Sequence, residues 1–252
     1  MRTIPVRAVL VLLTCALTAC SSGDNAAPDR LDTLAPSDTL PVARTTTTSS
    51  STTSNTATPV TAPAGTIALS ADGPWKLVDS APGVTAPGLV YELMPGLWAY
   101  LPTVEDIPNG ITWVLNKDDL PVIEAYLMAR LTYFKAITSK PMDLGLPGWK
   151  QWYADGGAAY RSNLESRSAQ GQVADLDAGV VLRPQVIGED RSEDTAVVFD
   201  CFVDGGVFRL PNGDLAPGSS IGSVDYGSAA RLKLDGTAWI VEQVGTQPDA
   251  CL

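Results

Sequence analysis

Residues 45–54 are ten consecutive threonines or serines, and they lie within a longer stretch, residues 21–65, that contains no aromatic residue. A segment of this composition cannot bury enough apolar surface to offset the conformational entropy that it would lose on ordering. It therefore predicts a disordered tether, whose 45 residues would span roughly 35–40 Å as a flexible coil. The tether is either a bare spacer or a carrier of O-linked sugars, and the sequence leaves both open. The folded part is then confined to residues 66–252.

The first 19 residues have the layout of a secretory leader. Two arginines lie at or before the start of an apolar stretch of twelve residues, Ala8–Ala19. Twelve helical residues span about 18 Å, which is too short for a bilayer core of about 30 Å, so a signal peptide is expected. The stretch ends in Leu-Thr-Ala-Cys at residues 17–20, which resembles the bacterial lipobox. This resemblance implies cleavage before Cys20 and lipid attachment to its thiol, with anchoring at the extracytoplasmic face of the cell membrane. The alternative is an ordinary secreted protein with a chance cysteine.

Charge and residue types exclude several classes of function. The formal net charge is −11, from 17 basic and 28 acidic residues. A nucleic-acid-binding protein needs a basic face, so no nucleic-acid partner is expected. The sequence contains no histidine, which removes Ser-His-Asp and Cys-His catalysis and histidine-ligated metal sites. We therefore expect neither a metal nor a cofactor.

The cysteine count predicts one disulfide bond. Of the four cysteines, Cys15 leaves with the leader and Cys20 takes the lipid, so Cys201 and Cys251 remain. An oxidising extracytoplasmic compartment favours their pairing. The bridge would close a loop of about 50 residues and add roughly 4 kcal/mol to the free energy of unfolding. The alternative, a reactive thiol at Cys201, has no histidine to activate it.

Residues 119–139 form the clearest helical pattern in the sequence. Their apolar side chains recur at the three- and four-residue spacing of one buried helix face, and Asp118 or Asp119 can cap the start. A second helix with a thinner apolar face is expected over residues 157–170, where Gly171 provides the stop.

After residue 170 the hydrophobic period switches from 3.6 to two, which indicates strands. Strands are expected at residues 179–188, 195–204, 206–210, 224–234 and 237–245, with Asp235-Gly236 as a tight hairpin turn. Residues 66–117 predict a β-rich N-terminal extension with short strands at 75–78, 89–93, 97–101 and 111–115. Helices followed by a run of strands predict an α+β fold, with helices packed on one face of a curved antiparallel sheet.

The order of these elements resembles a known type of lipoprotein. An alanine- and tyrosine-rich helix is followed by a second helix that carries Tyr-Ala-Asp-Gly-Gly-x-x-Tyr at residues 153–160. A strand carrying Asp200-Cys201 and a later strand carrying Trp239 complete the order. It resembles actinobacterial lipoproteins of the nuclear-transport-factor-2-like type. The resemblance implies a cone-like α+β domain over residues 118–252.

The resemblance also implies a space for a ligand between helix and sheet. Relatives with isomerase or cyclase activity use a carboxylate base with tyrosine donors in that space. Residues of these types are Asp200 on a strand and Tyr126 and Tyr133 on the first helix, and Trp152 could line the mouth of the pocket. None of them aligns with a family catalytic position, so catalytic residues stay unassigned. Asp200 could instead face solvent, and Trp152 could instead anchor a loop on the core.

The leading interpretation is a membrane-anchored extracytoplasmic lipoprotein with a non-catalytic binding or accessory domain. Its expected partners are the membrane, through the N-terminal lipid anchor, and a small apolar ligand or a cell-envelope protein. The alternative is a small isomerase, dehydratase or cyclase that uses Asp and Tyr in an apolar pocket. A carboxylate that acts as a base in such a pocket is expected to have a pKa well above about 4.

Overall fold

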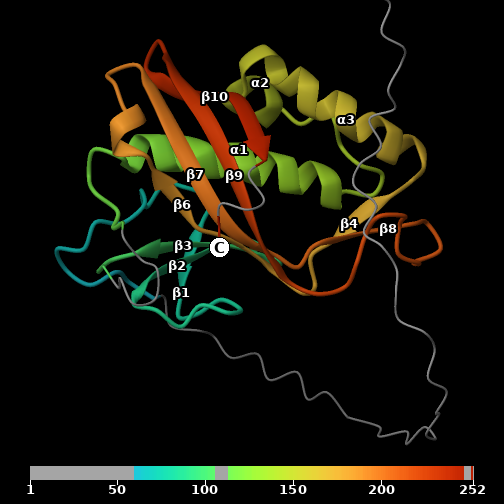
Figure 1. The fold of residues 1–252 in the computed structure, drawn as a ribbon, viewed down its shortest axis with the longest axis horizontal. Coiled ribbons are helices and arrows are strands. Elements are labelled where there is room, and N and C mark those ends of the chain that lie inside the picture. The colour runs from blue at the N-terminus through green and yellow to red at the C-terminus, as the bar shows by residue number, and fades with distance from the viewer. Residues whose placement is uncertain (1–59, 106–112, 247–250, 252) are drawn as a thin grey trace, which may run out of the picture. The chain divides into compact units, whose positions relative to one another are not determined.

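A computed structural model describes residues 60–105, 113–246 and 251 (Figure 1). These residues belong to one unit, Asn55–Leu252, while the predicted leader and most of the predicted tether lie outside the described residues. The strands are β1 (Lys76–Val78), β2 (Gly88–Met94), β3 (Leu97–Pro102), β4 (Val173–Asp175), β5 (Val180–Leu182), β6 (Pro184–Val186), β7 (Thr195–Asp204), β8 (Val207–Arg209), β9 (Val224–Asp235) and β10 (Ala238–Thr246). The helices are α1 (Leu120–Thr138), α2 (Gly148–Trp152) and α3 (Ala158–Ala169), with single 3-10 turns η2 (Ala154–Gly157) and η3 (Gly188–Asp190). The predicted α+β class is confirmed.

One large sheet organises the described residues. Its strand order is β1-β2-β3-β5-β7-β9-β10, and β6 also pairs with β7. All of these pairs are antiparallel except β3 with β5, which is parallel, so the sheet is mixed rather than wholly antiparallel. The segment expected to form a β-rich extension contributes β1, β2 and β3 to this same sheet. Strands β4 and β8 form a separate two-stranded sheet.

Helix α1 packs against the sheet and against α2. It contacts β6, β7, β9 and β10 as well as α2, and Figure 1 shows it crossing behind the long strands. Apolar side chains surround it almost completely, which is the pattern of a buried helix rather than of a surface helix with one apolar stripe. Polar side chains that α1 turns toward the sheet are therefore enclosed in the protein.

The start of α1 differs from the side-chain cap that the sequence predicts. Asp119 is the N-cap residue, but its side chain makes no capping hydrogen bond. Its backbone carbonyl instead accepts hydrogen bonds from the amides of Val122 and Ile123, at 3.0 and 2.9 Å. The Asp119 carboxylate is held by the Asn116 side chain and lies 3.8 Å from Arg191 Nε. Interactions with these neighbouring loops therefore outweigh the local cap.

The predicted strand 179–188 is two strands. Strand β5 pairs with the end of β7 and β6 pairs with its middle, and Arg183 lies between them. The Arg183 amide leaves the ladder because it donates a hydrogen bond, 2.7 Å long, to the Asp200 carboxylate. The Asp200 side chain thus takes the place of a backbone acceptor at Arg183. Hydrophobic periodicity cannot reveal this break in the strand.

Three smaller differences concern short elements. Residues 113–115 of the expected strand 111–115 have no strand structure, and residues 111–112 lie outside the described residues. Asp235 pairs with Ala238, so the two turn residues of the last hairpin are one position further along than expected. Helix α2 and strand β4 were not predicted, because elements of three to five residues are too short for a periodic signal.

Candidate functional site

Asp200 and Tyr126 meet in the interior between β7 and α1. The pleat of β7 turns every second side chain toward the helix, and Asp200 is one of them, with 0% of its surface exposed. One carboxylate oxygen of Asp200 accepts a hydrogen bond of 2.7 Å from the Tyr126 hydroxyl. The other accepts the bond of 2.7 Å from the Arg183 amide. The structure thus brings together two of the four predicted pocket residues and excludes the alternative that Asp200 faces solvent.

Burial dominates the electrostatics of this pair. It raises the pKa of Asp200, although the Arg130 charge, the Tyr126 hydrogen bond and the Arg183 amide act in the opposite direction. Burial also raises the pKa of Tyr126 well above its usual value, and the Asp200 charge adds to that rise. A raised carboxyl pKa fits a catalytic base, but both oxygens of Asp200 are already bonded and neither meets solvent. The pair therefore has the geometry of a structural bridge.

Arg130 lies one helical turn beyond Tyr126, on the same side of α1. Its guanidinium carbon lies 5.6, 5.1 and 5.0 Å from the ring centroids of Tyr133, Phe134 and Phe202, respectively. Burial alone would lower the pKa of Arg130, but the charges of Tyr126 and Asp200 outweigh it, and the pKa is raised. Arg130 therefore remains a cation within a ring of aromatic side chains.

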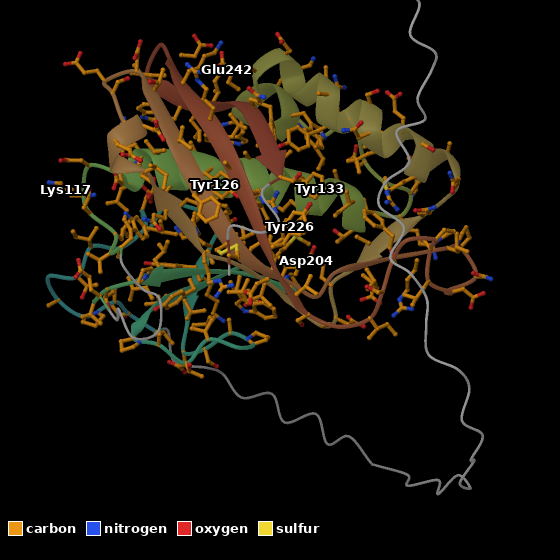
Figure 2. The ribbon with its side chains drawn as sticks, in the orientation of Figure 1. Lys117, Tyr126, Tyr133, Asp204, Tyr226 and Glu242 are labelled. Carbon is orange, nitrogen blue, oxygen red and sulfur yellow. A yellow bond between two sulfur atoms is a disulfide. The ribbon has the colours of Figure 1, made fainter. Side chains whose placement is uncertain are left out.

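Tyr133, the third predicted pocket residue, lies beside Arg130 rather than in contact with Asp200. Figure 2 places it close to Tyr226 and Asp204, near the end of β7 and the start of β9, and the charges of Arg130 and Asp204 act on its hydroxyl. Its ring lies 6.1 Å from that of Tyr160 on α3. Burial raises the pKa of Tyr133 and Asp204, and raises that of Tyr160 to about 12. We name Arg130, Tyr133, Tyr160, Asp204 and Tyr226 the Arg130 cluster.

Trp152, the fourth predicted pocket residue, lies at a different site. It lines a cavity of about 400 Å³ together with Trp75 and Trp239, and we name this site the tryptophan groove. The full lining is Ser70, Asp72, Gly73, Pro74, Trp75, Pro121, Glu124, Ala125, Met128, Trp152, Thr237, Ala238 and Trp239. The indole N–H of Trp75 donates a hydrogen bond of 2.7 Å to the Ser70 carbonyl, which fixes one wall. Sequence alone does not connect these three tryptophans, because they lie on segments far apart in the chain.

A polar hollow of about 630 Å³ lies next to the groove, between the loop at residues 116–119 and the loop at residues 191–193. Arg191 belongs to its lining, and its guanidinium carbon lies 4.7 Å from the ring centroid of Trp239. Burial raises the pKa of Asp119 in this hollow, although Asn116 and Arg191 act in the opposite direction. Arg191 therefore contributes both to the hollow and to the support of a tryptophan of the groove.

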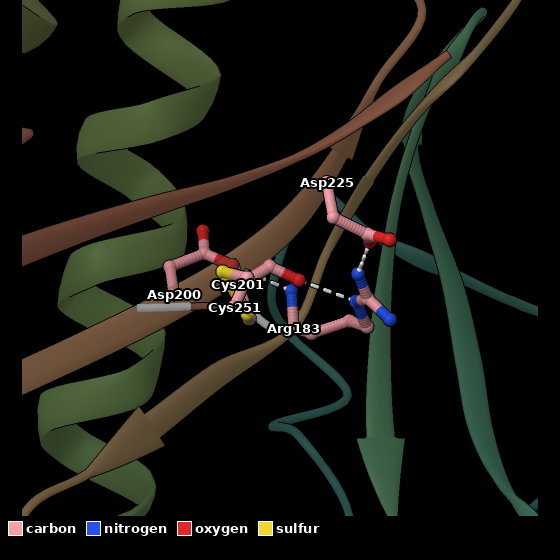
Figure 3. Close-up of a disulfide and its surroundings, with 5 residues drawn as sticks. All are labelled: Arg183, Asp200, Cys201, Asp225 and Cys251. Atoms are coloured by element: carbon pink, nitrogen blue, oxygen red, sulfur yellow. Dashed lines mark hydrogen bonds and ion pairs between the residues drawn. A yellow bond between two sulfur atoms is a disulfide. The ribbon is translucent and has the colours of Figure 1, made fainter. Parts of the chain in front are cut away.

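The predicted pairing of Cys201 with Cys251 is confirmed (Figure 3), and their Cα atoms are 5.6 Å apart. The bridge ties Cys251 to β7 directly beside Asp200. Arg183 reinforces the same region, because its side chain donates to the Cys201 carbonyl and forms an ion pair with Asp225. The predicted lipid-attachment residue, Cys20, lies outside the described residues.

In the described parts of the chain, residues 60–105, 113–246 and 251, no group of three or more Cys, Asp or Glu side chains is placed to hold a metal ion. No helix of these parts is long and apolar enough to cross a bilayer.

Removal of the Asp200 carboxylate is expected to destabilise the fold strongly. In Asp200→Ala, the Tyr126 hydroxyl and the Arg183 amide lose their acceptor, and buried Arg130 loses the negative charge near it. We expect the free energy of unfolding to fall by about 3–5 kcal/mol. Asp225→Ala is the matched control, because it breaks a surface ion pair with Arg183 and is expected to cost at most about 1 kcal/mol. Urea denaturation measures both, and equal losses would contradict the bridging role.

The raised pKa of Asp200 also predicts a pH dependence of stability. The folded state holds the Asp200 proton more tightly than the unfolded chain, so it binds more protons between the two pKa values. Stability is therefore highest below the unfolded pKa and falls as the pH rises through the folded pKa. Asp200→Asn removes this contribution, while the similar contributions of Asp119 and Asp204 remain. Urea midpoints measured from pH 4 to 8 should fall less steeply for the variant, and parallel curves would exclude Asp200 as the source.

Comparisons with known proteins leave the chain without an assigned family. No family model matches it, and no curated protein does. Among solved structures, the intermembrane space region of the chloroplast protein ARC6 aligns with 54% of this chain and 100% of its own, at 8% identity and a TM-score of 0.41. A likeness of this strength carries no argument about fold or function.

Proposed function

We propose that this protein is a lipid-anchored extracytoplasmic binding protein, and that its folded part binds a small apolar ligand in the tryptophan groove. The observation that carries the proposal is the groove itself. Its volume of about 400 Å³ lies within the usual range of small-molecule sites, about 300–1,000 Å³. Three indole rings converge on it from segments that the fold brings together.

The composition of the groove fits recognition of an apolar ligand with a polar tip. Indole rings offer a large contact area at a low cost in side-chain entropy. Trp75 and Trp152 are half-buried, so part of each ring stays available for contact, while Trp239 is almost fully buried and gives a firm floor. Glu124 and Thr237 add polar side chains at the edge.

The alternative function is a small isomerase, dehydratase or cyclase. It requires a carboxylate that can reach a substrate, and Asp200 is the residue predicted from the sequence for that role. Because Asp200 is fully buried and bonded at both oxygens, its geometry favours the binding protein over the enzyme.

Anchoring rests on the apolar leader, on the lipobox-like residues 17–20 and on the tether composition. The disulfide between Cys201 and Cys251 supports an oxidising compartment, because such bonds persist mainly outside the cytosol. Lipidation at Cys20 and placement on the extracytoplasmic face of the membrane are part of the proposal.

The anchor is tested by labelling cells with an alkyne-bearing palmitate. The wild-type chain should incorporate the label and fractionate with membranes, and Cys20→Ser should lose both properties because no thiol then accepts the lipid. Cys15→Ser, which changes a cysteine five residues earlier, is the matched control and should keep both. Retention of the label by Cys20→Ser would contradict the assignment.

The groove is tested by native mass spectrometry of the full chain isolated gently from the host cell envelope. The intact protein should carry an additional mass that is lost on denaturation. Trp152→Ala should lose this mass, because it removes one indole wall, while the exposed substitution Arg231→Gln should retain it. An empty wild-type chain, or a mass that survives Trp152→Ala unchanged, would argue against the groove as the ligand site.

A further inference from the structure

Arg130 has donors without acceptors. Its side chain leaves α1 toward the sheet, and only 9% of the residue surface is exposed. Its Nε is fully buried without a hydrogen-bond partner, and within the described ranges the guanidinium forms neither a hydrogen bond nor an ion pair. A guanidinium carries five N–H donors and keeps its charge at any ordinary pH. A buried donor without a partner costs roughly 1–3 kcal/mol, so its occurrence needs an explanation.

The surroundings of Arg130 compensate its charge without satisfying its donors. The rings of Tyr133, Phe134 and Phe202 attract the cation through their faces, but a ring face is a poor substitute for an oxygen acceptor. Asp200 is the buried negative charge that acts on Arg130, but it is committed to other donors, as described above. The fold thus holds the Arg130 cation in place and provides its N–H groups with no hydrogen-bond acceptor among the described residues.

Three half-buried tyrosines lie around Arg130 and its aromatic neighbours. The hydroxyls of Tyr133, Tyr160 and Tyr226 form no hydrogen bond with any residue that the structure describes, and all three side chains are half-buried. The Tyr226 ring lies 5.4 Å from that of Phe202, which itself packs against Arg130. Figure 2 shows Tyr133 and Tyr226 near each other, on different elements. Aromatic walls and hydroxyl tips therefore adjoin one buried cation.

We propose that the Arg130 cluster binds a small apolar carboxylate, with the carboxylate on the Arg130 guanidinium and the apolar body among the aromatic rings. The planar fork of arginine matches a carboxylate through two parallel hydrogen bonds. A single charge is favoured because one guanidinium cannot compensate a doubly charged phosphate in a site that also faces acidic residues. One of these, Asp204, accepts a hydrogen bond of 2.9 Å from the Gly206 amide. Burial raises the pKa of Asp204.

This site is separate from the tryptophan groove, and none of its five residues lines that groove. The inference therefore goes beyond the proposed function, and either site can fail without the other.

The test observes Arg130 directly. The full chain with Cys20→Ser, which removes the predicted lipid-attachment thiol, is labelled with ¹⁵N, and the Arg130 Nε–Hε resonance is assigned through bonds. Benzoate is then titrated against its uncharged counterpart benzamide at constant ionic strength. The resonance should shift saturably with benzoate, with a Kd at least tenfold lower than for benzamide. Equal affinities, or no shift, would overturn the proposal, as would a shift that sodium chloride alone reproduces, which would indicate water or unspecific ions.

Variants give a second measurement by calorimetry. Arg130→Lys keeps the charge but loses the fork, and benzoate should bind at least tenfold more weakly, while Arg231→Lys on the exposed face of β9 should bind normally. If Arg130→Lys does not fold, Tyr133→Phe replaces it, because this variant removes only a hydroxyl and should weaken benzoate binding several-fold. Unchanged benzoate affinity in a folded variant of either kind would contradict the site.

Discussion

The hydrogen bonds of Asp200 are the interaction on which the rest of the interior depends. The Tyr126 hydroxyl reaches Asp200 across 74 residues of sequence and joins α1 to β7, an interior strand of the sheet. The Arg183 amide reaches the same carboxylate and thereby separates β5 from β6. The disulfide at Cys201 then ties Cys251 to the neighbouring position of β7. One buried carboxylate thus links α1 to β7 and to the junction of β5 and β6, next to the disulfide.

This arrangement explains why a buried acid need not be catalytic. A carboxylate in an apolar interior has a raised pKa whether or not it performs chemistry, because burial disfavours its charge. Access distinguishes the two roles, and Asp200 is fully buried, with each of its oxygens already accepting a hydrogen bond. The two recognition sites that we propose lie elsewhere, in the tryptophan groove and in the Arg130 cluster.

The elements that were predictable from the sequence are those with a strong period. Helix α1 and strands β7, β9 and β10 are long enough for their apolar spacing to be decisive. The parallel pairing of β3 with β5 was not predictable, since it depends on contacts between distant segments.

The residues of the candidate sites also differ in how far the sequence predicts them. Asp200 and Tyr126 could be nominated together through the resemblance, whereas Trp75 and Trp239 could not be linked to Trp152 without the strand order. The cavity that Trp152 lines is shared with Trp75 and Trp239, and its lining does not include Tyr126, Tyr133 or Asp200.

The arginine of α1, Arg130, is buried and keeps its positive charge there. A lysine at that depth would lower its pKa and lose its charge, because burial disfavours the ammonium. Arginine does not lose its charge on burial, so the interior holds a permanent cation. The charge of Asp200 acts on Arg130, but its two oxygens accept hydrogen bonds from Tyr126 and Arg183 rather than from Arg130. The remaining electrostatic need is for an oxygen acceptor in the plane of the guanidinium, which the aromatic walls cannot provide and a ligand can.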